Sequence, residues 1–247
     1  MPHLRIALIT LLLSSHCLAA DTIRICAEND WQPFSFSKKG QAVGASVDLI
    51  RAAFAKEGIE TLFISGSYNR CLKLTLAGQY DAMLDVGKNQ ERLPQFIWPQ
   101  TPFIMMNLHL IANHQQVQHE VSYRVLSGKR IGITAGYEYP DKMLSQAGIL
   151  KVESSSELAN LRQLAAGRID FMLLSEGTFA NLSKQLSSAE RKAVRDWGLV
   201  DQLGLYLAFS PKASNASRWA KAFDRGLNEL QKKGEDRQIF ARWSAVP

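Results

Sequence analysis

The sequence is poor in cysteine and has no apolar run long enough to cross a membrane. Three of its 247 residues are cysteine and eight are proline. A membrane-spanning helix needs about 20 consecutive apolar residues, whereas the apolar run at residues 6–13 ends at Ser14. This run and the small residues that follow it predict that residues 1–20 are a secretory signal peptide, cleaved near Ala19 or Ala20. A lipid attachment at Cys17 is disfavoured because His16 stands where a small residue is expected.

The chain also lacks a strong excess of one charge. Its 29 Lys and Arg residues stand against 23 Asp and Glu residues, and they are scattered along the chain. This pattern is typical of a solvated surface and does not favour nucleic-acid binding. A hydrophobic fraction of 46% suffices for a large core, in one domain or in two lobes.

Two cysteines, Cys26 and Cys71, remain after the predicted cleavage. Disulfides persist in a secretory compartment, so the pair is either one bridge between the first strand and the second helix or two buried thiols. The sequence leaves both open because it does not give the distance between the Cα atoms. Three histidines lack metal-ligand spacing and are expected on an exposed strand and loop: His109, His114 and His119. We therefore expect no metal site and no cofactor.

Apolar periodicity predicts two successive units of alternating strands and helices. In the first unit, strands are expected at residues 22–27, 61–64 and 80–86, and helices at 47–56 and 68–76. In the second unit, strands are expected at 131–134, 150–152 and 169–174, and helices near 140–146 and at 157–166. A strand at 204–210 and helices at 217–233 and 239–243 should return to the first lobe. This order predicts an α/β fold with parallel sheets.

Four groups of short motifs follow one another along the chain. They are Trp31-Gln-Pro-Phe34 with Gly44-Ala-Ser-Val-Asp48-Leu; Leu76-Ala-Gly-Gln-Tyr-Asp81; Asn89-Gln-Glu-Arg92 with Phe96, Pro99, Pro102 and Phe103; and Leu126-x-Gly-Lys-Arg-Ile-Gly132 with Ala166-Gly-Arg-Ile-Asp170. In this order they resemble the family 3 periplasmic solute-binding proteins, which serve polar amino-acid ABC importers. Tyr68-Asn-Arg-Cys-Leu72 also resembles a less characterised branch of that superfamily, whose ligands are often uncertain.

The resemblance implies the two-lobed periplasmic binding protein fold (type II), in which each lobe is a βαβ sheet sandwich and the ligand cleft lies between the lobes. We place lobe 1 at residues 21–108 plus 205–247 and lobe 2 at 109–204. The implied function is that of a monomeric periplasmic receptor without enzymatic activity. It would capture an amino acid or a similar small polar solute and deliver it to an ABC transporter permease in the inner membrane.

The resemblance also indicates the lobe 1 residues that would hold the solute near the strand ends. Arg92 stands where the family binds the α-carboxylate, to which a guanidinium can donate two parallel hydrogen bonds. Trp31 and Tyr68 are expected as aromatic walls, and Glu28 as a contact for a cationic group. Alternatively, Arg92 is a surface residue at a helix start, and the two aromatic rings only pack within the lobes. Glu28 is then a solvated loop acid.

Asp85 and Gly87 are expected on the loop after the third strand, where the family offers hydroxyls and backbone groups to the ligand. Asp85 departs from that pattern and makes a plain neutral amino acid less certain. Its alternative role is to cap a turn.

In the second lobe, Gly136-Tyr137-Glu138 resembles the family's Gly-Thr-Thr carboxylate loop and is expected to open a helix. Tyr137 and Glu138 replace its two hydroxyl residues, and Glu138 could instead stabilise the helix dipole. Ser175 occupies the position of the family's aspartate for the α-amino group, and Glu176 follows it. Either Glu176 or Glu138 replaces that carboxylate, or the ligand has no such ammonium group.

Two rival functions stay open at this point. One is an enzyme on the same fold, similar to the periplasmic cyclohexadienyl dehydratase, and the other is a soluble ligand sensor that serves a membrane receptor. An enzyme needs a general acid beside a carboxylate clamp, which Glu138, Glu176 and Lys88 could form. The sequence has no Gly-x-Ser-x-Gly motif, phosphate loop or metal signature, so it favours binding over catalysis.

Overall fold

The first half of the molecule is built on three strands from the start of the chain. The computed structural model describes residues 21–117 and 120–244. The strands are β1 (Thr22–Glu28), β5 (Glu60–Gly66) and β6 (Ala82–Gly87), and β1 pairs in parallel with both of the others. Helices α1 (Ala45–Lys56) and α2 (Tyr68–Leu76) connect them. The predicted strand, helix, strand, helix, strand order is confirmed here.

The second half repeats this arrangement. Strand β8 (Arg130–Thr134) pairs in parallel with β9 (Leu150–Ser154) and with β10 (Phe171–Ser175). The helices of this half are α3 (Asp141–Leu144), α4 (Glu157–Ala165), α5 (Glu176–Ser183) and α6 (Ser188–Lys192). The last two were not predicted.

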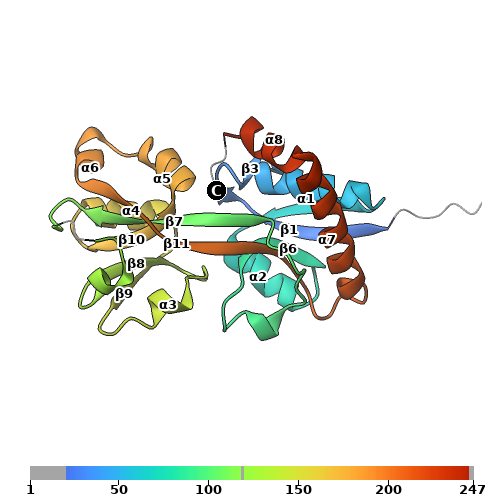
Figure 1. Ribbon diagram of the computed structural model, residues 1–247, viewed down its shortest axis with the longest axis horizontal. Helices are drawn as coiled ribbons and strands as arrows, with labels where there is room; N and C mark the ends of the chain where they lie inside the picture. Colours follow the sequence, from blue (N-terminus) through green and yellow to red (C-terminus); the bar gives the residue numbers. More distant parts are fainter. Residues whose placement is uncertain (1–20, 118–119, 245–247) are drawn as a thin grey trace, which may run out of the picture.

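Two long strands join the halves. They are β7 (Ile104–Asn113) and β11 (Val194–Phe209), which pair antiparallel with each other and run between the two lobes (Figure 1). The sheet order is β5-β1-β6-β11-β7-β10-β8-β9. The sheet is therefore mixed, whereas the sequence predicted parallel sheets alone. The proposed lobe boundaries at 108/109 and 204/205 fall within these two strands and stay a prediction.

A small three-stranded sheet lies beside the first half. It consists of β2 (Asp30–Trp31), β3 (Ser35–Lys38) and β4 (Gln41–Val43). The sequence pattern predicted no strand in this segment. Two short 3-10 helices complete the described elements, η1 (Leu93–Gln95) and η2 (Tyr123–Leu126).

The end of the chain returns to the first half, as predicted. Helix α7 (Ala216–Lys233) buries one apolar face, and Phe223 on that face lies 5.6 Å from the ring of Phe54 in α1. Gly226 lets α7 approach α1 closely, since a Cβ atom there would lie 2.0 Å from the carbonyl oxygen of Ala53. Helix α8 (Glu235–Arg242) follows beside α1 (Figure 1). Within residues 21–117 and 120–244, no helix combines the length and the apolar character that crossing a membrane requires.

Cys26 and Cys71 form a disulfide, which decides the question that the sequence left open. Their Cα atoms are 5.4 Å apart, and both residues are buried. The bridge ties β1 to α2.

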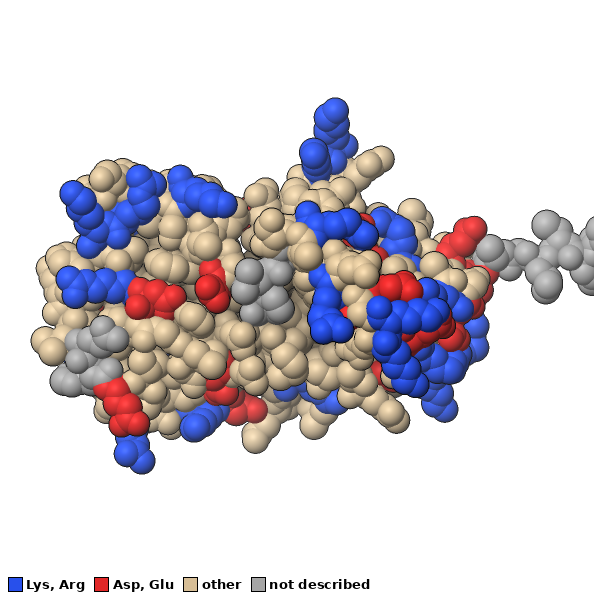
Figure 2. Space-filling view, turned by 45° about the horizontal axis from the view of Figure 1, so that its top comes forward, with Lys and Arg blue, Asp and Glu red and all other residues tan. Residues whose placement is uncertain are grey.

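The described histidines do not gather into a metal-binding cluster. His109 lies in β7, partly buried, and contacts the Asp196 carboxylate at 2.8 Å, whereas His114 is exposed. His119 lies outside the described residues. Among the residues that the structure describes, no three His, Cys, Asp or Glu side chains are placed to hold a metal ion. On the face shown in Figure 2, basic side chains are scattered among acidic ones.

Candidate functional site

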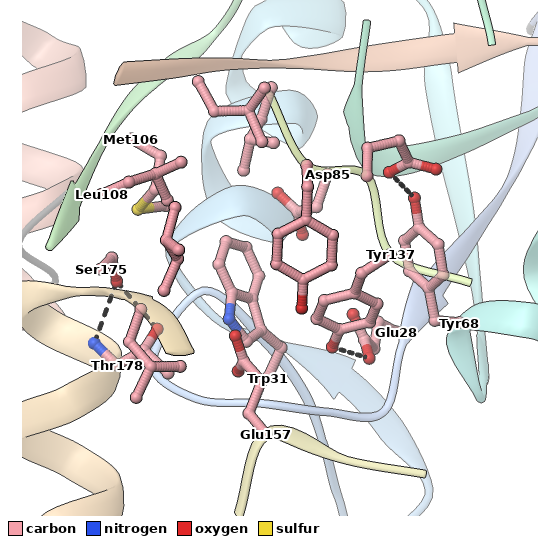
Figure 3. Close-up of a pocket in the computed structure, with 16 residues that line it drawn as sticks. Glu28, Trp31, Tyr68, Asp85, Met106, Leu108, Tyr137, Glu157, Ser175 and Thr178 are labelled. Atoms are coloured by element: carbon pink, nitrogen blue, oxygen red, sulfur yellow. Dashed lines mark hydrogen bonds between the residues drawn. The ribbon is translucent and has the colours of Figure 1, made fainter. Parts of the chain in front are cut away.

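A cavity of about 580 Å³, part of it open to solvent, lies where the two halves meet. Seven of the ten predicted ligand residues line it: Glu28, Trp31, Tyr68, Asp85, Tyr137, Glu138 and Ser175. Figure 3 shows them converging from both halves, with the Trp31 ring near the centre. Arg92, Gly87 and Glu176 are not among its lining residues.

Glu28 is the last residue of β1 and is buried, not a solvated loop acid. Its carboxylate accepts a hydrogen bond of 2.6 Å from the Tyr137 hydroxyl, which comes from the other half (Figure 3). Burial raises the pKa of Glu28 well above its usual range, although this hydrogen bond opposes the rise. Burial likewise raises the pKa of Tyr137, so its hydroxyl stays protonated and donates.

Asp85 lies within β6 and not on the loop after it, because the strand continues to Gly87. Its backbone φ of 63° is in the left-handed region that side chains rarely adopt. The Ser46 hydroxyl donates to Oδ1 at 2.7 Å, while Oδ2 is buried without a hydrogen-bond partner. Burial raises the pKa of Asp85 to about 7. Strained backbone clusters at functional sites, and an unpaired buried acceptor calls for an explanation, so Asp85 is a candidate functional residue.

Glu138 lies in a loop, and the prediction that Gly136-Tyr137-Glu138 opens a helix is wrong. Helix α3 starts only at Asp141. Pro140 disfavours helical backbone in the residue before it, so the helix cannot extend back to Tyr137. In this loop the Glu138 carboxylate is nearly inaccessible and accepts hydrogen bonds from Tyr68 at 2.5 Å and from the Gly87 amide at 3.2 Å.

Arg92 is buried behind the cavity and is not a surface residue. Its Nε donates to Glu138 at 2.7 Å, and Nη2 donates to the carbonyl oxygen of Gly136 at 3.3 Å. Nη1 donates to Glu91 and Gln95. Desolvation lowers the pKa of Arg92, but the hydrogen bond to Glu138 and its negative charge outweigh this and raise it. In this structure the guanidinium therefore binds a carboxylate of the chain itself.

Ser175 ends β10 and caps α5. Its hydroxyl accepts a hydrogen bond of 3.0 Å from the Thr178 amide and donates one of 2.8 Å to the Thr178 hydroxyl. Glu176, the next residue, lines a separate cavity beside Pro33 and Trp243. The structure thus brings Glu138 to the main cavity and does not bring Glu176 there.

The family model that matches this chain is the one for bacterial extracellular solute-binding proteins, family 3, and it matches residues 23–246. The chain belongs to this family.

Known relatives of this family 3 solute-binding protein cover most of its length. The arginine-binding extracellular protein ArtP of Bacillus subtilis (strain 168) is 22% identical over 222 residues, which are 87% of this chain and 82% of that protein. A histidine kinase sensor domain with similarity to periplasmic binding proteins superposes with a TM-score of 0.76 at 19% identity, covering 91% of this chain and 96% of the other. AncCDT-1, an ancestral amino acid-binding protein and precursor of cyclohexadienyl dehydratase, gives 0.69 at 18% identity, covering 90% and 94%.

The solute-binding protein also has cavity residues that sequence reasoning missed. They include Glu157, Tyr139 and Thr178. Glu157 is the first residue of α4, after the end of β9, and burial raises its pKa to about 8. The rule that site residues follow strand ends could have found it. Trp31, which was predicted, stacks on Phe34 at 4.5 Å and leaves its buried Nε1 without a partner.

The three residues considered for an enzymatic site are not assembled around one point. Glu138 lines the main cavity and Glu176 lines the other one. The Lys88 ammonium lies over the rings of Trp98 and Tyr206, at 5.7 and 5.2 Å from their centroids. The rings stabilise the ammonium group in this position. In this arrangement Lys88 forms no ion pair with Glu138 or Glu176.

Proposed function

We propose that this family 3 protein is a periplasmic receptor that captures a small polar solute, an amino acid or a similar molecule, without catalysing a reaction. It would then present the solute to an ABC transporter permease in the inner membrane. One observation carries the proposal: a cavity lined by aromatic rings and buried carboxylates from both halves lies between them. The arginine-binding relative ArtP supports a small solute of the amino-acid class.

Hydrogen bonds between the two halves support the capture of a solute by closure of the cleft. The hydrogen bonds Tyr137 to Glu28 and Tyr68 to Glu138 both cross between the halves over the cavity. The Asn69 side chain donates another, to the carbonyl oxygen of Ala135 at 3.0 Å. A solute that contacts both halves favours the closed state by its differential affinity for that state.

The location and the permease are supported by indirect observations. Residues 1–20 have the pattern of a secretory signal, and a disulfide between Cys26 and Cys71 suits an oxidising compartment. The family supplies the expectation of a transporter. Loss of solute uptake on deletion of a neighbouring permease would support this role, whereas uptake that persists would speak for a sensor.

A thermal-shift screen of residues 21–247, refolded to remove carried-over ligand, tests the capture step. The panel comprises amino acids, amines and small organic acids. A ligand at a hundred times its dissociation constant should stabilise the fold by about 2.7 kcal/mol. Absence of any shift would contradict the receptor, and conversion of prephenate or arogenate by the protein would replace it with the dehydratase-like enzyme.

A further inference from the structure

The lining of the cavity is rich in acidic side chains. Four carboxylates line it: Glu28, Asp85, Glu138 and Glu157. None of the residues described as lining it is Lys, Arg or His. A neighbouring cavity shares Glu28 and Glu157 and adds Asp30. A solute bound in either cavity therefore lies beside acidic side chains.

The cation that would bind a ligand carboxylate is already engaged. Each nitrogen of the Arg92 guanidinium has an acceptor within the chain, and the Glu138 carboxylate takes Nε. Glu138 is itself fixed by the Tyr68 hydroxyl and the Gly87 amide. A ligand carboxylate would have to displace a buried anion that three donors hold.

A buried oxygen of Asp85 without a hydrogen-bond donor indicates, independently, which group the ligand supplies. Asp85 is 6% exposed, its Oδ2 has no hydrogen-bond donor, and it lies beside the cavity (Figure 3). Since an ionised carboxylate is costly to bury alone, a cationic donor from the ligand would complete this site. The Trp31 Nε1 is an unpartnered donor as well, but it is uncharged and cannot balance a ligand carboxylate.

We propose that the solute bound in this cleft is an organic cation without a carboxylate, such as an aliphatic amine or an alkylguanidine. Its ammonium or guanidinium group binds Asp85, and the rings of Trp31 and Tyr68 enclose its carbon chain. The Glu138 carboxylate pairs with Arg92 and takes the place that the carboxylate of an amino acid would occupy. This inference rests on the proposed function, because it assumes that the ligand occupies the cavity between the halves.

Amino acids and their decarboxylated counterparts form matched probes for this proposal. Calorimetric titration of the refolded residues 21–247 at pH 8 should compare arginine with agmatine, lysine with cadaverine, and ornithine with putrescine. In each pair that binds, the decarboxylated member should have a dissociation constant at least tenfold lower. Equal or tighter binding of the amino acid overturns the proposal.

Failure of the two proposals can be told apart. If none of the six compounds binds while a neutral or acidic solute does, the cationic ligand is overturned and the receptor stands. If nothing in the wider panel binds, the receptor fails and this inference fails with it.

Variants locate the contact. Asp85→Asn keeps a side chain of the same shape but removes the charge, and it should weaken agmatine or diamine binding at least tenfold. Glu157→Gln serves as a second carboxylate variant and should weaken it less than Asp85→Asn does. Glu153→Gln changes an exposed acid on β9 and should leave binding unchanged. Unaltered affinity in a folded Asp85→Asn protein overturns the assigned contact.

Discussion

The Arg92 guanidinium and the Glu138 carboxylate form an ion pair of 2.7 Å whose side chains are 10% and 4% exposed. One partner belongs to the first half of the molecule and the other to the second. Buried charges persist when they are paired and hydrogen-bonded, and here Tyr68 and Gly87 satisfy the carboxylate further. The residue that sequence similarity assigns to a ligand carboxylate therefore holds the two halves together in this structure.

Breaking that pair from one side should be costly. Arg92→Ala leaves Glu138 buried without a cation, so the free energy of unfolding should fall by about 3 to 5 kcal/mol. Joint replacement of Arg92 and Glu138 by methionine removes both charges and should cost much less. Urea unfolding measures both, with Lys233→Ala, which removes an exposed ion pair, as a control that should lose little stability. If Arg92→Ala lost no more stability than Lys233→Ala, the buried ion pair would not stabilise the fold.

Freeing the guanidinium should change specificity. Glu138→Gln keeps the size of the side chain but removes the charge that competes for Arg92. Affinity for arginine relative to agmatine should then rise on the order of tenfold, because a ligand carboxylate gains an unpaired cation. Calorimetric titration of both compounds with the wild type and the variant gives this ratio. If it stays constant, Glu138 does not exclude the carboxylate.

The disulfide should contribute strongly to stability. Cys26 and Cys71 are separated by 45 residues, and a loop of that size corresponds to about 4 kcal/mol in the chain-entropy description. Replacing both with alanine should lower the free energy of unfolding by about 2 to 5 kcal/mol. Urea unfolding with and without reductant checks this, since the wild type should lose stability in reductant and the double variant should not. If reductant lowered the stability of the wild type and of the double variant equally, the disulfide would be contradicted.

Sequence reasoning predicted the βαβ units because their strands are buried apolar runs bounded by clear helix starts. It gave no bounds for β7 and missed the first part of β11, where polar side chains such as Asn107 and Asp196 interrupt the run and the register shifts near Leu199. Glu28 was found because it follows the predicted strand at residues 22–27, and Ser175 because it occupies the position of the family's aspartate. The pairing of Arg92 with Glu138 could not be predicted from the sequence, because it depends on how the two halves of the molecule close on each other.

Contact between α7 and α1 offers a test of packing. A Cβ atom at Gly226 would lie 2.0 Å from the Ala53 carbonyl oxygen and 2.8 Å from its carbon, both backbone atoms that cannot yield cheaply. Gly226→Ala gains helix propensity of about 1 kcal/mol, but the clash should outweigh it and destabilise by about 1 to 3 kcal/mol. Asn228→Ala on the exposed side of α7 isolates propensity and should be neutral or stabilising. Thermal unfolding distinguishes the two, and a stabilised Gly226→Ala would refute the close approach.

Stability of the ligand-free protein should fall as the pH rises from about 4 to about 8. The pKa of Asp85 rises from 3.8 to about 7 and that of Glu157 from 4.5 to about 8, in both cases because of burial. Between the unfolded and folded pKa values the folded state binds more protons than the unfolded one. The stabilisation is therefore complete below the unfolded pKa and is lost as the pH approaches the folded pKa.

Each of these groups can contribute a slope of up to about 1.4 kcal/mol per pH unit. The unfolding temperature of refolded protein, measured from pH 4.5 to pH 8.5, should decline more steeply for the wild type than for Asp85→Asn, because the amide does not titrate. A cationic ligand should reverse the trend, since it pairs with the ionised carboxylates and binds more tightly as they lose their protons. Identical pH profiles for the wild type and Asp85→Asn would show that Asp85 is not the buried titrating group.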